Sequence, residues 1–216
     1  MKNKLPQNKK AIVWLCGGHF INDIYTGVLN PIMPFIAAKI GITMAIATII
    51  LTVSHIFSSL LQPLFGYFAD NIVKRSFIFW GLILSSIFIP LSALAHNPFI
   101  LVLFIIFGSI GSSLFHPQAL GFVSKFADKE NTGKAMAVFV AMGTLGYSFG
   151  PIISSAITQF LGMPRMPLMT ILGILWAFLM FAFVPKLSLS EPVISKIDFK
   201  TAFKRILTNR KLNILN

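Results

Sequence analysis

Residues 77–95 read FIFWGLILSSIFIPLSALA, a run of 19 residues without a charged side chain. A helix needs about 20 predominantly apolar residues to cross the hydrocarbon core of a bilayer. The run is too long for an ordinary strand, and it lacks the alternation of a transmembrane β-barrel. It therefore predicts a membrane-spanning α-helix.

Five further apolar stretches approach or exceed this length: residues 11–38, 44–69, 98–124, 134–161 and 166–185. Of the 216 residues, 56% are hydrophobic and 11% are charged, whereas an ordinary soluble domain has about 25% charged residues. A soluble core of this size could not bury so much apolar surface. Short junctions separate the stretches, which favours antiparallel neighbouring helices. The sequence predicts an all-α membrane protein with six transmembrane helices.

Basic residues gather at alternate junctions. Sixteen of the 18 Lys and Arg lie in residues 1–10, in the turns at 70–76 and 125–134, or after residue 185. By the positive-inside rule, we expect both termini in the cytoplasm and, if the source is bacterial, a location in the plasma (inner) membrane. The net charge of +12 follows from this placement. The expected partner is the lipid bilayer, and no nucleic acid is needed to explain the charge.

Three segments follow from this pattern. They are a cytoplasmic N-terminus (1–10), a six-helix transmembrane domain (11–185) and a cytoplasmic basic segment (186–216). In the last segment, Phe199 and Phe203 share one helical stripe. Two interpretations stay open for it: a basic amphipathic helix on the membrane surface, or a solvated linker with incidental periodicity.

The first apolar stretch contains His19, Asn22 and Asp23. His19 and Asp23 are four residues apart, so they share one face of a helix. An acid at the middle of a spanning helix costs about 2.5–3.5 kcal/mol on insertion scales. Such a carboxylate can bind a cation or carry a proton, or the polar pair can lock helix packing. The sequence leaves both interpretations open.

Polar side chains also recur in two other stretches. The second stretch places His55 and Gln62 with two serines at helical spacing, and the fourth places His116 with serines and is followed closely by Gln118. They predict either a polar cavity or interhelical hydrogen bonds. The third and sixth stretches hold few polar groups. We therefore expect those two to be peripheral and to face lipid, while the other four line a cavity.

The fifth stretch holds Gly143, Gly146 and Gly150, followed directly by Pro151. Small residues at this spacing let another helix approach closely. The Gly150-Pro151 pair predicts a kink or hinge. Helix packing is a sufficient explanation of the pattern, and gating is an additional hypothesis.

An intramembrane enzyme is a further alternative for the polar residues. It would need paired ligands such as His-Glu-x-x-His, and the sequence has no such motif. The single cysteine, Cys16, has no partner for a disulfide or a cysteine-based metal site. We expect no enzymatic activity, no metal and no cofactor.

Residues 66–75 read GYFADNIVKR. This stretch resembles the signature between the second and third helices of the major facilitator superfamily, a glycine followed by an acid and then by a glycine and basic residues. Asn71 and Val73 depart from the family pattern. The matching residues are Gly66, Asp70, Lys74 and Arg75.

Three other stretches are similar to the fosmidomycin-resistance subfamily: HFIND at 19–23, SSLLQPLFGY at 58–67 and GSSLFHP at 111–117. Residues 146–151 are similar to the small-residue motif in the fifth helix of that subfamily. The resemblance implies a secondary active transporter, a proton-coupled antiporter that exports small organic compounds or drugs. Its partners would be the small-molecule substrate and protons.

The resemblance also implies roles for particular residues. The residues expected along the substrate and proton pathway are His19, Asn22, Asp23, His55, Gln62, His116 and Gln118. Gln118 stands where some relatives have an acid. The resemblance therefore leaves Asp23 as the stronger candidate for the proton carrier. Asp70, Lys74 and Arg75 would form a cytoplasmic gating contact.

Members of this family have two six-helix halves around one cavity, related by an axis along the membrane normal. The resemblance covers only the first half and the connecting segment, so we expect an N-terminal half, from a truncated or split product. A second half, on a separate chain or in a parallel homodimer, could complete the cavity. Alternatively, the chain is a non-transporting fragment or a scaffold that pairs with a second half.

Overall fold

The computed structural model describes residues 8–71 and 75–186, with the side chains of 68–71 outside that description. Within this part, the chain forms helices and no strands. The long helices are α1 (Lys9–Ile40), α2 (Met44–Asn71), α3 (Arg75–Leu91), α4 (Pro98–Phe126), α5 (Thr132–Phe160) and α6 (Thr170–Phe183). Two short 3-10 segments, η1 (Ser92–Leu94) and η2 (Met163–Met169), follow α3 and precede α6.

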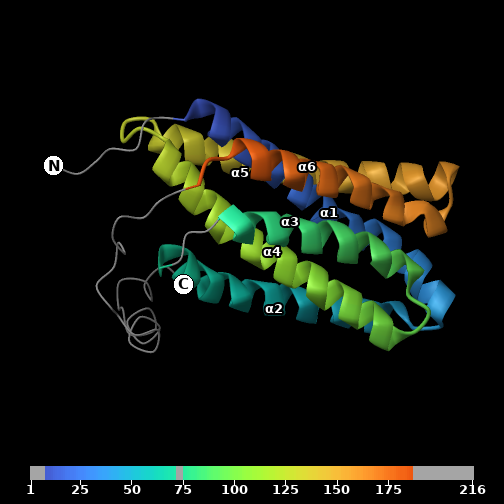
Figure 1. The fold of residues 1–216 in the computed structure, drawn as a ribbon. Coiled ribbons are helices and arrows are strands. Elements are labelled where there is room, and N and C mark those ends of the chain that lie inside the picture. The colour runs from blue at the N-terminus through green and yellow to red at the C-terminus, as the bar shows by residue number, and fades with distance from the viewer. Residues whose placement is uncertain (1–7, 72–74, 187–216) are drawn as a thin grey trace, which may run out of the picture.

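The helices pack side by side in one elongated bundle (Figure 1). Helix α1 packs most extensively on α5, α3 packs on α4 and α6, and α2 packs mainly on α4. Helix α2 therefore lies at an edge of the bundle (Figure 1). The basic segment 186–216 lies almost entirely outside the described residues.

Five of these elements are long and apolar enough to cross a membrane: 44–67, 75–94, 98–126, 132–160 and 163–183. Helix α1 is the exception among the long described helices. It has 32 residues, but His19, Asn22, Asp23 and Asn30 lower its hydropathy. The prediction of an all-α, multi-pass membrane protein is confirmed, and a sixth span remains a prediction.

Local sequence signals explain where several helices begin and end. The Asn8 side chain accepts a hydrogen bond from the Ala11 backbone N–H (2.9 Å), and Asn97 caps α4 in the same way through Ile100 (2.9 Å). Such side chains satisfy backbone donors that have no partner within the helix. Helix α1 ends at Gly41, whose φ of 73° lies in the left-handed region that favours glycine.

Helix α3 is more buried than the sequence predicts. More than half of its span is buried within the bundle, the largest share among the five candidate spans. Ser85 and Ser86 are fully buried, whereas Trp80 on the outer side is exposed. The expectation that residues 77–95 form a lipid-facing helix is therefore wrong for the serine-bearing face. A serine hydroxyl can bond within its own helix, so it can pack in an apolar interior.

Helices α2 and α5 are the most exposed of the candidate spans. Exposed apolar side chains on α2 include Ile49, Val53, Ile56 and Leu60. On α5 they include Val138, Leu145, Phe149 and Ile152. The described part of the chain therefore presents two broad apolar faces on these helices.

Candidate functional site

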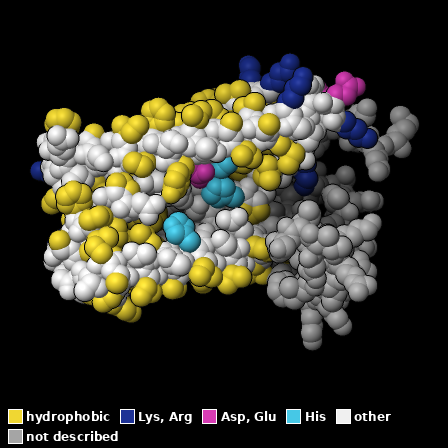
Figure 2. All heavy atoms as spheres, turned by 180° about the vertical axis from the view of Figure 1, so that it is seen from behind, with side chains coloured by type: hydrophobic (Ala, Val, Ile, Leu, Met, Phe, Trp, Pro, Cys, Tyr) yellow, Lys and Arg dark blue, Asp and Glu magenta, His cyan; other side chains and the backbone are white. Residues whose placement is uncertain are grey.

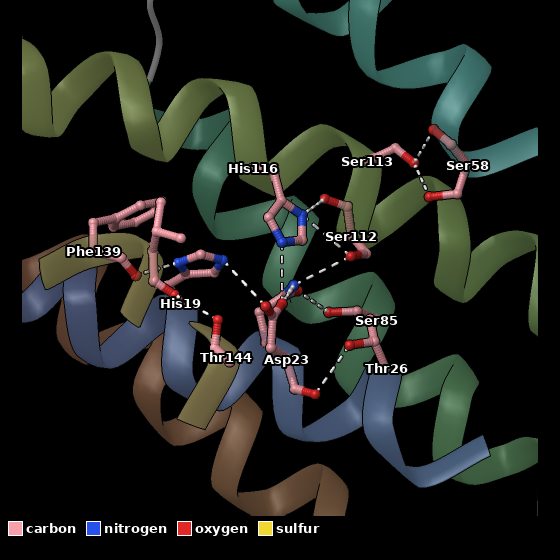
Figure 3. A network of polar contacts seen from close by, with 12 residues as sticks. His19, Asp23, Thr26, Ser58, Ser85, Ser112, Ser113, His116, Phe139 and Thr144 are labelled. Atoms are coloured by element: carbon pink, nitrogen blue, oxygen red, sulfur yellow. Dashed lines mark hydrogen bonds and ion pairs between the residues drawn. The ribbon is translucent and has the colours of Figure 1, made fainter. Parts of the chain in front are cut away.

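The polar site begins on one face of α1. The Nε2 atom of His19 lies 3.2 Å from Oδ2 of Asp23, one helical turn further on. The α4 side chain of His116 brings its Nε2 atom to 3.0 Å from Asp23 Oδ1 (Figure 3). Two histidines from different helices thus contact the two oxygens of one carboxylate. We call His19, Asp23 and His116 the polar hub.

The hub lies deep in the bundle but is not sealed. The side chain of His19 is 7% exposed, that of Asp23 15% and that of His116 26%. His19 is therefore the buried end of the hub, and His116 is its more open end. The ring of His19 stacks on Phe139 of α5 with centroids 4.0 Å apart, which covers the buried end.

Asn22 joins the hub to two other helices. Its Nδ2 donates to Asp23 Oδ1 (3.0 Å) and to Ser112 Oγ on α4 (3.2 Å). Its Oδ1 accepts a hydrogen bond from Ser85 Oγ on α3 (2.8 Å). Asn22 is fully buried, so these contacts satisfy an amide that would be costly to leave unpaired. Ser85 had no predicted role in the site, since it lies in the stretch with few polar groups.

A cavity of about 210 Å³ lies beside the hub. Its polar lining comes mainly from α1, α2 and α4: Asp23, Thr26, His55, Ser58, Ser59, Gln62, Ser109, Ser112 and His116, with Tyr147 from α5. Figure 2 shows histidine side chains and an acidic side chain together midway along this face, while Lys and Arg gather mainly at one end of the molecule. The cavity is therefore a polar recess midway along an apolar bundle.

The structure brings some of the predicted pathway residues together and leaves others apart. His55 and Gln62 line the same cavity as Asp23 and His116, and within the described part of the chain no hydrogen bond or ion pair joins them to the hub. Gln118 is buried, and neither atom of its amide has a partner among the described residues. It does not line the cavity. Helices α2 and α4 are joined instead by Ser58 and Ser113, whose hydroxyl oxygens are 2.7 Å apart (Figure 3).

The glycines of α5 lie directly against α1. A Cβ atom on Gly143 would meet the His19 ring and lie 2.7 Å from Asp23 Oδ2, so this glycine packs on the hub. A Cβ on Gly146 would collide with the Phe20 carbonyl, and one on Gly150 would lie 2.5 Å from the Ile24 carbonyl. Helix α5 continues through Pro151 to Phe160.

The predicted gating residues are only partly within the described structure. Lys74 and the side chain of Asp70 lie outside it. Arg75 begins α3, and its guanidinium donates to the Val184 carbonyl just after α6 (2.7 Å). The same group lies 4.1 Å from the centre of the Phe181 ring. Gly66 faces Pro117, which a Cβ would approach to 3.9 Å.

One candidate ligand atom from each of the three hub residues lies within 4.8 Å of the other two. That spacing is compact enough for a shared cation. It is also what the two imidazole–carboxylate contacts, at 3.2 and 3.0 Å, require by themselves. Cofactor binding has no further support among the described residues.

Comparison with known proteins gives a consistent picture. The family model described as Major Facilitator Superfamily matches residues 15–215. The riboflavin transporter RibZ of Clostridioides difficile is 27% identical over 188 residues, which are 87% of this chain and 41% of RibZ. The fosmidomycin resistance protein of Escherichia coli is 31% identical over 140 residues, 64% of this chain and 34% of that protein. The predicted resemblance to that subfamily is thereby confirmed.

Solved structures agree on the fold. A POT family transporter crystallised with 5-aminolevulinic acid superposes with a TM-score of 0.72 at 18% sequence identity. The match covers 98% of this chain and 48% of that one. The chain thus spans less than half the length of these relatives. The relatives are membrane transporters rather than enzymes, and the chain belongs to the major facilitator superfamily.

Proposed function

We propose that this chain works in a secondary active transporter that exports small organic compounds in exchange for protons. The observation that carries the proposal is the polar hub, in which Asp23 is held by two histidines beside a cavity of about 210 Å³. Ionisable side chains inside a membrane bundle are costly, so they commonly mark substrate or proton pathways. An exchanger needs such a group next to the space that its substrate occupies.

Helix α1 is proposed as a sixth span. With 32 residues it is about 48 Å long at 1.5 Å per residue, more than the roughly 30 Å of a hydrocarbon core. Two of its polar side chains point into the bundle: Asn22 is 0% exposed, and the His19 side chain is 7% exposed. Six spans place both termini on one side, which is the cytoplasm by the distribution of Lys and Arg. In a bacterium this membrane is the inner membrane.

In the proposed cycle, protonation of the polar hub around Asp23 favours one orientation of the cavity and deprotonation favours the other. Substrate and protons then compete for the same recess, so export of one is tied to entry of the other. His55 and Gln62 line the recess from α2, and we assign them to substrate contact. Gln118 is buried and does not line the cavity, so we assign it a packing role on α4. Asp70, Lys74 and Arg75 remain proposed gating residues.

A second six-helix unit would cover the apolar faces of α2 and α5. In this family the two units are related by an axis along the membrane normal, so they have the same orientation. Such a unit could belong to the same polypeptide, to a separate chain or to a second copy. In the alternative, this chain alone does not transport and acts only by pairing with such a unit. The exposed residues on α2 and α5 support either arrangement.

The relatives suggest the first compounds to test. Cells that express this chain are challenged with fosmidomycin, and their inverted membrane vesicles are tested for energised accumulation of riboflavin. The proposal predicts resistance or accumulation that a protonophore abolishes. Export that persists without a proton gradient would contradict proton coupling. A chain that exports only when a second six-helix unit is co-expressed would support the pairing alternative.

A further inference from the structure

The two hub histidines face Asp23 with the same ring nitrogen. In His19, Nδ1 lies 2.7 Å from the Phe139 carbonyl oxygen, and in His116 it lies 2.7 Å from the Ser112 carbonyl oxygen. A carbonyl oxygen can only accept, so Nδ1 carries the hydrogen in both rings. The Nε2 atom of a neutral ring in this tautomer is a bare acceptor. Neutral rings would thus direct two lone pairs at the carboxylate.

The carboxylate is arranged as an acceptor on both oxygens. Oδ1 accepts from Asn22 Nδ2 at 3.0 Å and lies 3.0 Å from His116 Nε2. Oδ2 lies 3.2 Å from His19 Nε2. The Asn22 amide is oriented by Ser85, which donates to its oxygen. This pattern of surrounding donors is that of an ionised carboxylate with charge-assisted hydrogen bonds.

The number of protons between the rings and the carboxylate decides how many of the two contacts are favourable. With no proton between the rings and the carboxylate, both contacts are acceptor against acceptor. One proton satisfies one contact and leaves the other unfavourable. Two protons, one at each Nε2, satisfy both. Because the contacts of Asp23 are those of an ionised carboxylate, each of the two protons is expected on a ring nitrogen, so the number of imidazolium rings equals the number of protons.

We propose that His19 and His116 are themselves proton carriers and that the polar hub holds two exchangeable protons in this conformation. This inference rests on the proposed function and deepens it, because it assigns the coupled protons to two imidazoles that share one carboxylate. In each cycle the hub takes up two protons from solvent and later releases two. Its net charge is +1 with both protons bound and −1 without them. The positive state has access to water in the cavity, since His116 is 26% exposed.

The part of the cavity lining that the structure describes holds no acid besides Asp23. Among the described residues that line the cavity, the other titratable side chains are His55 of α2 and Tyr147 of α5. The Tyr147 hydroxyl accepts from Asn30 Nδ2 at 3.1 Å. Helix α3 contributes the neutral Ser85 through Asn22. Both protons of the hub therefore depend on Asp23.

The proposal is tested by counting imidazolium rings. The chain is labelled with ¹⁵N histidine and reconstituted in neutral-lipid nanodiscs, so its four histidines give separate NMR signals. His96 lies in the junction between η1 and α4, and His55 lies on α2, so neither belongs to the hub. The variants His55→Gln and His96→Asn assign the signals of these two residues. At the pH of the export assay, the two remaining rings are expected to be protonated on both nitrogens.

Asp23→Asn is expected to convert both hub rings to the neutral form, with helix content checked by circular dichroism. The wild-type count decides the proposal even if that variant does not fold. One imidazolium or none in the wild type, or a stoichiometric bound metal in place of the protons, would overturn it. Proton-coupled export with a single imidazolium would leave the proposed function standing and remove this inference. Two imidazoliums in a protein whose export ignores the proton gradient would overturn the proposed function alone.

Discussion

Helix α1 has two faces that pack in different ways, one through polar side chains and the other through its backbone. Toward α4 it carries Asn22 and Asp23 in a hydrogen-bonded network that reaches His116. Toward α5 it offers bare backbone at the Phe20 and Ile24 carbonyls, which lie against glycines. The polar face needs hydrogen-bonding partners, and the backbone face leaves no room for a Cβ atom at the opposing glycines. One helix thereby combines the polar hub with the most extensive helix–helix packing in the described bundle.

The two faces of α1 meet at Gly143 of α5, where the close helix packing also determines the position of hub side chains. This glycine belongs to the packing ridge of α5, yet a Cβ there would meet His19 and Asp23. The close approach of α5 also brings the Phe139 carbonyl to His19 Nδ1. Tight packing therefore positions the hub, and substitutions on each face should separate the two contributions.

The largest effect on stability is expected from Gly146→Leu. Its side chain would collide with the Phe20 carbonyl, and overpacking of this kind costs about 1–3 kcal/mol or more. SDS-induced unfolding in mixed micelles measures the loss. The matched control is Gly121→Ala on α4, where a Cβ meets nothing within 4 Å. Equal stability of the Gly146→Leu variant and the wild type would show that the two helices are not packed as described.

A smaller effect is expected from Ser85→Ala. The change leaves the buried Asn22 oxygen without its Ser85 donor (2.8 Å in the wild type). An orphaned buried acceptor costs about 1–3 kcal/mol. Ser86→Ala is the control, since that hydroxyl bonds only within its own helix, to Ile83. If both alanine variants lower the free energy of unfolding equally, the hydrogen bond from Ser85 to Asn22 does not contribute the predicted stability.

The smallest effect is expected from Tyr25→Phe. The Tyr25 hydroxyl donates to the Met169 carbonyl at the start of α6 (2.7 Å). Interhelical hydrogen bonds in a membrane protein average about 0.6 kcal/mol, so the loss should be of that size. The unfolding assay again measures it, while export should be unchanged. A loss of export without a loss of stability would assign Tyr25 to the transport pathway.

Much of the fold follows from apolar run lengths. The runs at 98–124 and 44–69 became α4 (Pro98–Phe126) and α2 (Met44–Asn71) with ends shifted by two residues or fewer. The sixth run was less regular, because residues 163–169, which include Pro164 and Pro167, form a 3-10 segment before α6. The length of an apolar run does not show which face of its helix is buried, so the sequence could not predict that the serine-bearing face of α3 packs within the bundle.

The site was predictable only where its residues share a helix. Spacing alone puts His19 and Asp23 on one face of α1. His116 is 93 residues away from Asp23, and nothing in a single sequence specifies that contact. Ser85 and Gly143 were missed as neighbours of the hub for the same reason. Arg75 was assigned to gating by resemblance, whereas its observed partners are Val184 and Phe181.

The central claim is that Asp23 couples export to protons, and one measurement tests it most directly. Inverted vesicles with the wild-type chain, Asp23→Asn or the control His96→Asn are energised with a proton gradient, and accumulation of the compound found in the export assay is followed. We predict accumulation at wild-type level for His96→Asn. For Asp23→Asn, which keeps the size of the side chain but cannot ionise, we predict a fall to the level of vesicles treated with protonophore. Gradient-driven accumulation by Asp23→Asn at the wild-type rate would contradict the account.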